Sequence, residues 1–168
     1  MTSFTFKNNR SKLNKSSLAR KEDNDCVVKA IMHSFGVTYE RAHSWCEENL
    51  ERQPKQGVYN VENKMFDLSQ NGTKFNNKQI IFLGNSPKES RKRRHITNQD
   101  KTILINPKYL PFQRAYTVGM FALDYKKGTY FILVQGHALC IKNGIIIDSP
   151  GFIGKGLKRP IEQAFQII

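Results

Sequence analysis

Residues 129–148 read TYFILVQGHALCIKNGIIID, and this stretch decides the fold. It holds three apolar runs, which are separated first by Gly136 and then by Asn143-Gly144. Asn-Gly between two apolar runs is the strongest short-range sign of a β-hairpin, because both residues accept the positive φ of a two-residue turn. We therefore predict successive strands of an antiparallel sheet in this part of the chain.

The predicted two-residue turn also fixes the register of the hairpin. Counting back from the turn places Leu139 opposite Asp148, and His137 shares the face of Leu139 because the two are two residues apart. His137 and Asp148 are then diagonal neighbours within side-chain reach. Cys140 has the opposite parity, so we expect a third reacting group to approach this pair on the face opposite Cys140.

Upstream, residues 24–36 read NDCVVKAIMHSFG and predict a helix. Apolar residues recur at helical spacing, and Gly36 ends the pattern. Asn24 or Asp25 can serve as the N-cap, which places Cys26 in the first turn. Unsatisfied amides and the helix dipole favour an anion there, so we expect a lowered thiol pKa and a larger thiolate population.

The rest of the chain completes an α+β pattern, with helices first and an antiparallel sheet second. Thr38 is a suitable N-cap for a second helix that runs to Leu50, and Thr117 is suitable for a short later helix. Apolar spacing adds a helix from residue 61 to a stop at 71–72, strands over 79–83 and 102–105, and a last strand over 163–168 that closes the sheet. We predict a single domain over residues 22–168.

The positive charge of the chain is concentrated in two polar segments. The 27 Lys and Arg residues exceed the 14 Asp and Glu residues, which gives a formal charge of +13. Residues 1–21 hold six basic and no acidic side chains, and residues 86–101 hold six basic and two acidic ones. We predict a flexible basic arm over 1–21 and a basic loop over 86–101, because few apolar residues anchor either segment.

The basic segments are candidate contacts for nucleic acid or for an acidic protein. Their densest run consists of Arg91, Lys92, Arg93 and Arg94. Such segments bind polyanions by releasing counterions, without reading sequence. A second interpretation stays open, in which the charges are solvated and only keep the protein in solution. No zinc-finger spacing, glycine-rich phosphate loop or RNA-binding aromatic motif accompanies the charge, so sequence-specific recognition is not supported.

Length and composition exclude several classes of protein. A chain of 168 residues fits one domain, and 39% hydrophobic residues are compatible with one core. No apolar run approaches the ~20 residues of a membrane span, and no stretch resembles a signal peptide. Cys26, Cys46 and Cys140 are too few and too widely spaced for a disulfide framework. We therefore expect a cytoplasmic protein with reduced thiols and no membrane partner.

Cys26, His137 and Asp148 are the candidate catalytic residues. A thiolate at a helix start, an imidazole on a strand and a carboxylate that orients the imidazole form a nucleophilic triad. Taken alone, Cys26 is more simply a structural cysteine and His137 a surface residue, but the combination favours the triad. His43 and Cys46 have a spacing that can hold a metal, yet no further Cys or His pair completes a site. We expect no metal and no cofactor, and we expect Cys46 in the core.

Residues 24–50 and 115–168 contain several short motifs in a defined order. They are Asn24-Asp25-Cys26 with the Gly36 hairpin, Gly136-His137-Ala138, Asn143-Gly144 with Asp148, and the tail from Lys158 to Ile167. In this order they resemble papain-like cysteine peptidases, and small bacteriophage members of that superfamily most closely. The resemblance implies a papain-like fold, in which N-terminal helices including the nucleophile helix pack on a C-terminal antiparallel β-sheet.

The same resemblance implies a role for each residue of the triad. Cys26 corresponds to the nucleophile, His137 to the general base and Asp148 to the residue that orients the histidine. Papain-like enzymes usually carry a Gln about six residues before the nucleophile, where it stabilises the oxyanion, and this chain has Arg20 at that position. Asn24 and the backbone N–H of Cys26 are the substitute oxyanion donors that we consider.

The sequence thus predicts a cysteine-dependent hydrolase that forms an acyl-enzyme on Cys26, most simply a peptidase with a protein or peptide substrate. Amidases, acyltransferases and isopeptidases that remove ubiquitin-like tags use the same triad and stay open. A different class also stays open, namely a basic viral binding protein that engages nucleic acid or a host protein. If the chain is viral, the expected location is the host cytoplasm.

Overall fold

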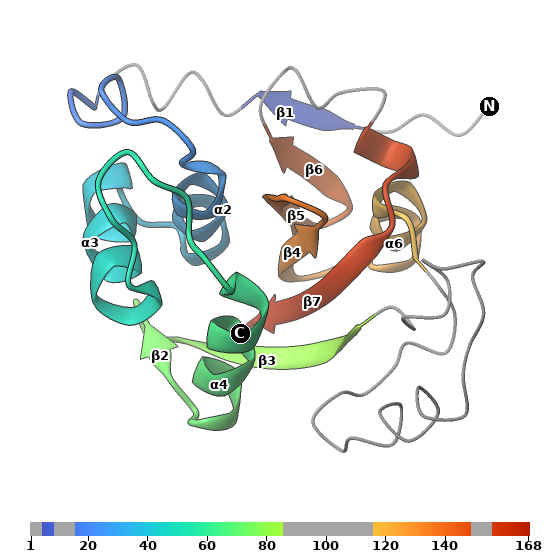
Figure 1. Ribbon diagram of the computed structural model, residues 1–168. Helices are drawn as coiled ribbons and strands as arrows, with labels where there is room; N and C mark the ends of the chain where they lie inside the picture. The colour runs from blue at the N-terminus through green and yellow to red at the C-terminus, as the bar shows by residue number, and fades with distance from the viewer. Residues whose placement is uncertain (1–4, 9–15, 86–115, 149–155) are drawn as a thin grey trace, which may run out of the picture.

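The computed structural model describes residues 5–8, 16–85, 116–148 and 156–168 (Figure 1). The helices are α2 (Cys26–Phe35), α3 (Tyr39–Leu50), α4 (Val61–Gln70), α6 (Val118–Asp124) and the short 3₁₀ turn η3 (Gly156–Lys158). The strands are β1 (Phe6–Asn8), β2 (Lys74–Phe75), β3 (Lys78–Asn85), β4 (Thr129–Val134), β5 (His137–Lys142), β6 (Ile145–Asp148) and β7 (Ile161–Ile167). The basic loop 86–101, with Arg91 to Arg94, and the strand expected over 102–105 lie outside the described residues.

The α+β class agrees with the prediction, but the expected order of helices first and sheet second does not, because β1 precedes the helices and α6 lies between β3 and β4 in the chain. The sheet has seven strands in the order β1-β6-β5-β4-β7-β3-β2. Neighbouring strands are antiparallel except for β1 and β6, which are parallel. Within the described ranges, no helix has both the length and the apolar character needed to cross a lipid bilayer.

Helices cover both faces of the sheet, and this explains why its central strands are continuous apolar runs. On one face, α2 and α3 pack on Phe131, Leu133 and Phe165. On the other face, α6 packs on Ile132 and Leu139. Figure 1 shows α2 and α3 on the opposite side of the sheet from α6. Alternate residues of one strand therefore enter different cores, and both sets are apolar.

The hairpin between β5 and β6 has the predicted register. Lys142 pairs with Ile145, and two further pairs follow up the ladder to Cys140 opposite Ile147. Asn143 and Gly144 both have positive φ, at 52° and 75°. This is the combination that a two-residue hairpin turn requires, so the local turn signal was sufficient here.

The predicted helix ends are also confirmed. Gly36 ends α2 in the left-handed conformation, with φ 71° and its backbone N–H bonded to the Met32 carbonyl. The hydroxyls of Thr38 and Thr117 accept backbone N–H bonds from the first turns of α3 and α6. Each helix therefore begins or ends where a residue satisfies its free backbone groups.

Strand β7 does not close the sheet as expected, because it lies between β4 and β3. Its residues enter both cores, with Ile161 on the α6 side and Phe165 and Ile167 on the α2 side. A strand that is buried on both faces is stabilised by a neighbour at each edge, so the middle of the sheet suits this segment better than an edge.

Parts of residues 1–21, the predicted basic flexible arm, contact the rest of the chain where the structure describes them. Residues 6–8 pair in parallel with β6, so that Asn8 lies opposite Asp148. The Ile146 backbone N–H donates to the Thr5 carbonyl at 3.1 Å. Further along, Ser16 is buried and its hydroxyl accepts the Ala19 N–H at 3.1 Å. Without β1, β6 would be an open sheet edge, and pairing satisfies its backbone groups.

Candidate functional site

His137 and Asp148 meet at the end of the β5–β6 hairpin that is farthest from its turn. The His137 Nε2 atom lies 3.0 Å from Oδ1 and 2.9 Å from Oδ2 of Asp148. The Asp148 side chain is 4% exposed and the His137 side chain 17% exposed. The predicted proximity of these two residues is confirmed, and it depends on the register that the Asn-Gly turn imposes.

Cys26 is the first residue of α2 and completes a three-residue constellation with this pair. A hydrogen bond joins its side chain to His137, and the backbone N–H groups of Ala138 and Val27 donate to its sulfur. Because Nε2 of His137 faces Asp148, Nδ1 is the ring nitrogen left for the thiol. Helix α2 and strand β5 thus bring their first residues together.

Burial and charge have opposite effects on the pKa of Cys26. Burial alone raises the pKa, but the hydrogen bond and positive charge of His137, with the two backbone N–H groups, more than offset it. The pKa of the thiol therefore falls below its usual value of 9.0. This agrees with the expectation for a cysteine at a helix N-terminus, although a histidine contributes most of the lowering.

The pKa of His137 moves in the opposite direction. Burial lowers it, but hydrogen bonds to Asp148 and Cys26 and the negative charges of both raise it to about 9. The lowered thiol pKa and the raised imidazole pKa show that each group favours the charged form of the other. Such a pair holds a nucleophile and a proton donor side by side.

Comparison with known proteins gives no match. The comparison covered protein-family models, curated proteins and solved structures. The interpretation of the site therefore depends on its own geometry and electrostatics.

The face on which α2 packs differs from the prediction. We expected Cys26 to approach on the face opposite Cys140, but α2 packs on the same face as Cys140. Ser34 of α2 lies beside the Cys140 thiol, and Ala138, which has the same parity as Cys140, lies in the same apolar cluster as Val27. Cys26 still contacts His137, because each is the first residue of its element. At the end of a strand, side chains from the two faces of the sheet can approach each other.

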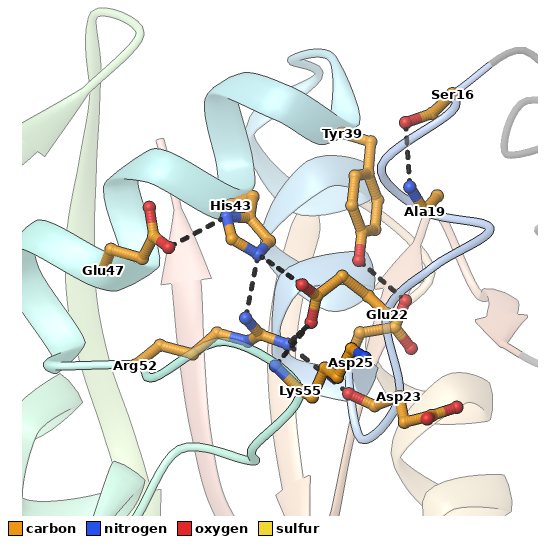
Figure 2. Close-up of polar contacts among 10 residues, drawn as sticks. All are labelled: Ser16, Ala19, Glu22, Asp23, Asp25, Tyr39, His43, Glu47, Arg52 and Lys55. Atoms are coloured by element: carbon orange, nitrogen blue, oxygen red, sulfur yellow. Dashed lines mark hydrogen bonds and ion pairs between the residues drawn. The ribbon is translucent and has the colours of Figure 1, made fainter.

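Asp25 occupies the predicted N-cap position of α2, but its side chain is used elsewhere (Figure 2). The Tyr39 hydroxyl donates to Asp25 Oδ2 at 2.9 Å, and the Lys29 ammonium lies 2.7 Å from Oδ1. The carboxylate therefore binds α3 and the second turn of α2 rather than the free N–H groups at the helix start. Those N–H groups are available to an anion at Cys26.

The candidate oxyanion residues lie just before the helix. Asn24 is exposed and has a left-handed backbone, with φ 52°. Gly57 lies beside it, since a Cβ on Gly57 would be 3.9 Å from the Asn24 Cβ. Arg20 is exposed in the preceding turn, where its Nε donates to the Ser16 carbonyl at 3.4 Å.

The other two cysteines differ from Cys26 in burial and in pKa. Cys46 and Cys140 are fully buried, and burial raises the pKa of Cys46 to about 12 and that of Cys140 to about 11. Cys46 therefore packs in the core, as predicted.

His43 is buried against Arg52. Among the described residues, no three His, Cys, Asp or Glu side chains are grouped to hold a metal ion.

Two features near the site were missed from the sequence. One is a buried ion pair between Glu22 and Arg52, whose partners are 30 residues apart. The other is the pair Asn85 and Gln163, which face each other on β3 and β7. Their side-chain oxygens are buried without a hydrogen-bond partner among the described residues. Gln163 lies two residues before Phe165, so strand alternation places both side chains on the same face. This spacing is the sequence pattern that could have predicted the burial of Gln163.

Proposed function

We propose that the chain is a cysteine-dependent hydrolase of papain-like fold that cleaves peptide bonds through an acyl-enzyme on Cys26. The observation that carries the proposal is the placement of His137 between Asp148 and Cys26. Any one of these residues alone has an ordinary structural explanation. A buried imidazole that bonds a carboxylate on one side and a thiol of lowered pKa on the other is typical of nucleophilic catalysis.

In the acylation step, the Cys26 thiolate attacks the carbonyl carbon of the scissile bond. A carbon–sulfur bond forms while the carbonyl oxygen gains the negative charge. The backbone N–H of Cys26 at the start of α2, with the Asn24 side chain, is the proposed donor set for this oxyanion. His137 then gives its proton to the leaving amine nitrogen as the carbon–nitrogen bond breaks.

In the deacylation step, neutral His137 takes a proton from water, and the resulting hydroxide attacks the thioester carbon. The carbon–sulfur bond breaks and the Cys26 thiolate is restored beside protonated His137. Asp148 keeps the ring oriented and stabilises its positive charge in both steps. Transfer of the acyl group to an amine instead of water would give an acyltransferase, and an isopeptide substrate would give a deconjugating enzyme.

The alternative function is a basic binding protein, of viral origin, in which the domain only presents positive charge to nucleic acid or a host protein. The formal charge of +13 favours it. This alternative predicts that Cys26→Ala leaves all biological activity unchanged. The hydrolase proposal predicts that Cys26→Ala abolishes hydrolysis, while any nucleic-acid binding is unaffected by the substitution.

An alkyne-tagged iodoacetamide tests the proposal at about pH 6.5, where ordinary thiols are protonated. We expect Cys26 to be labelled far faster than the buried Cys46 or Cys140, and His137→Ala to slow the labelling of Cys26 while keeping the thiol. A peptide pool followed by mass spectrometry then tests for cleavage, with Cys26→Ala as the inactive variant and Cys140→Ala as the matched control. Equal labelling of the three cysteines, or unchanged cleavage by Cys26→Ala, would contradict the proposal.

A further inference from the structure

The segment that leads into Cys26 is fixed by a buried guanidinium (Figure 2). Arg52, just beyond the end of α3, has a fully buried side chain. Its Nη2 donates to Glu22 Oε2 at 2.7 Å and to the Asp23 carbonyl at 3.4 Å. The Lys55 backbone N–H donates to the same Glu22 oxygen at 2.9 Å. One side chain thus binds both the backbone and a carboxylate of the residues that precede the nucleophile helix.

His43 completes the surroundings of the guanidinium, and its Nε2 also lies 3.5 Å from Glu22 Oε1. Arg52 Nη1 lies 2.8 Å from His43 Nε2. A guanidinium only donates hydrogen bonds, so Nε2 must accept and the proton of a neutral ring must be on Nδ1. The Nδ1 atom lies 3.5 Å from a carboxylate oxygen of Glu47. The ring therefore connects Arg52 to the middle of α3.

A second tether holds the other end of the same segment. Tyr39, one helical turn before His43 on α3, donates to Asp25. The residues from Glu22 to Asp25 are therefore tied to α3 at both ends, by Arg52 and by Tyr39. Between the two ties lies Asn24 with a positive φ of 52°. A residue with a Cβ adopts this conformation at a free-energy cost, and it persists where the surroundings impose it.

Stability alone explains this arrangement poorly. Buried ion pairs often contribute little to folding, since the desolvation of both charges offsets their attraction. Here the guanidinium is not even fully satisfied, because Arg52 Nε is buried without a hydrogen-bond partner among the described residues. What the ion pair does provide is a fixed position for the residues directly before Cys26.

We propose that Arg52 is a positioning residue for the nucleophile, acting through Glu22 and the Asp23 carbonyl to fix the turn that aims Cys26 at His137. The inference rests on the proposed function and deepens it, because it assigns a role to a residue that touches neither the thiol nor the imidazole. It makes the contact between Cys26 and His137 dependent on an ion pair on the far side of the turn.

The test uses the full chain and needs no substrate. Iodoacetamide alkylation of Cys26, measured against pH, reports the thiolate population, and amide hydrogen exchange reports the order of residues 22–28. For Arg52→Met we expect at least a tenfold slower alkylation near pH 6 and faster exchange over 22–28. Arg52→Lys keeps the positive charge but lacks the planar guanidinium with its several N–H donors, so its alkylation rate should lie between those of Arg52→Met and the unaltered protein. Arg41→Met, on the exposed face of α3, is the matched control and should change neither measurement.

Because Arg52→Met leaves the Glu22 carboxylate without its partner, Glu22→Gln serves as a second variant that keeps an acceptor of similar shape. It should slow alkylation in the same direction by a smaller factor. Variants that lose stability but keep the alkylation profile and the exchange rates of the unaltered protein would overturn the positioning role. An ordinary thiol profile in the unaltered protein would instead overturn the proposed function, and this inference with it.

Discussion

The Nε2 atom of His137 is shared almost equally between the two carboxylate oxygens of Asp148, at 3.0 and 2.9 Å. A single ring N–H that faces both oxygens leaves the imidazole little freedom to rotate. The carboxylate also carries the negative charge that favours the protonated ring. Orientation and charge are therefore supplied by one residue, and substitutions can separate them.

Asp148→Asn should keep the orientation and remove the charge. An Asn oxygen can still accept from Nε2, so the ring stays in place, but the pKa of His137 should fall below about 9. The alkaline limb of the activity profile should then move to lower pH. The loss of activity should be smaller than for His137→Ala, which removes a proton-transfer group worth ~10²–10⁴-fold. Rates measured across pH for both variants check this, and an unmoved alkaline limb would contradict it.

The opposite pKa shifts of Cys26 and His137 predict how the stability of the protein depends on pH. A raised His137 pKa adds stability below pH 6.5 that is lost as the pH rises through about 9. A lowered Cys26 pKa adds stability above pH 9.0 that is lost as the pH falls through the folded-state pKa. Below pH 9.0 the two contributions therefore change with pH in opposite directions, and each offsets part of the other.

Cys26→Ala removes one side of this balance. Only the raising of the His137 pKa by Asp148 then remains, so the free energy of unfolding should decrease as the pH rises above 6.5, by up to about 1.4 kcal/mol per pH unit. Urea denaturation at several pH values measures the slope. The unaltered protein should show a smaller slope, because the lowered pKa of Cys26 has the opposite effect, and equal slopes in both proteins would argue against mutual stabilisation of the two charges.

The turns at the two ends of β5 offer a matched pair of glycine substitutions. Gly144 has φ 75°, and a Cβ there would lie 3.1 Å from the Ala122 carbonyl oxygen. Gly136 has φ 67°, but a Cβ there would meet no atom within 4 Å. Both Ala variants should lose ~1–2 kcal/mol from the left-handed backbone. Gly144→Ala should lose more than Gly136→Ala in urea denaturation, because only its new methyl group meets backbone.

Two N-terminal deletions should differ in cost. Removing residues 1–8 takes away β1, whose pairing with β6 involves three residues, so the domain should fold with a modestly lower melting temperature. Removing residues 1–21 also deletes Leu18 and Ala19, which pack against the α2 core. The larger deletion should therefore lower the melting temperature further, and equal melting temperatures would show that this packing contributes nothing.

Gln163 should be replaceable without loss of stability. The residue is 3% exposed, and its Oε1 is buried without a hydrogen-bond partner among the described residues. An unsatisfied buried oxygen costs free energy, so Gln163→Leu should leave the free energy of unfolding unchanged or raise it by about 1 kcal/mol. Gln166→Leu, on the half-buried side of the same strand, is the control. A clear loss for Gln163→Leu would indicate a hidden polar contact.

The features predicted well from the sequence are those with local causes. Gly36 ends a helix and Asn143-Gly144 makes a turn through their own backbone preferences, so neighbours along the chain suffice to identify them. The contact between His137 and Asp148 followed from that turn, because a two-residue loop leaves only one register. No local signal places Cys26 near His137, so this contact was predicted from the combination of Cys, His and Asp residue types.

The features predicted poorly depend on partners far along the chain. The central place of β7 and the face chosen by α2 are decided by which apolar surfaces meet, and many pairings share one pattern of alternation. Asn24 or Asp25 was expected to cap α2, and Asp25 holds the N-cap position, but its carboxylate binds Tyr39 and Lys29 instead of the helix N–H groups. The Arg52–Glu22 pair has no local pattern at all.

The pairing of β1 with β6 has a consequence for the order of folding. Phe6 and Ile146 are about 140 residues apart, so β1 can bind only after the β5–β6 hairpin exists. During synthesis, the first strand of the sheet therefore leaves the ribosome long before its partner and must wait for it. We therefore expect the sheet edge beside Asp148 to be among the last parts of the sheet to form, when β1 pairs with β6.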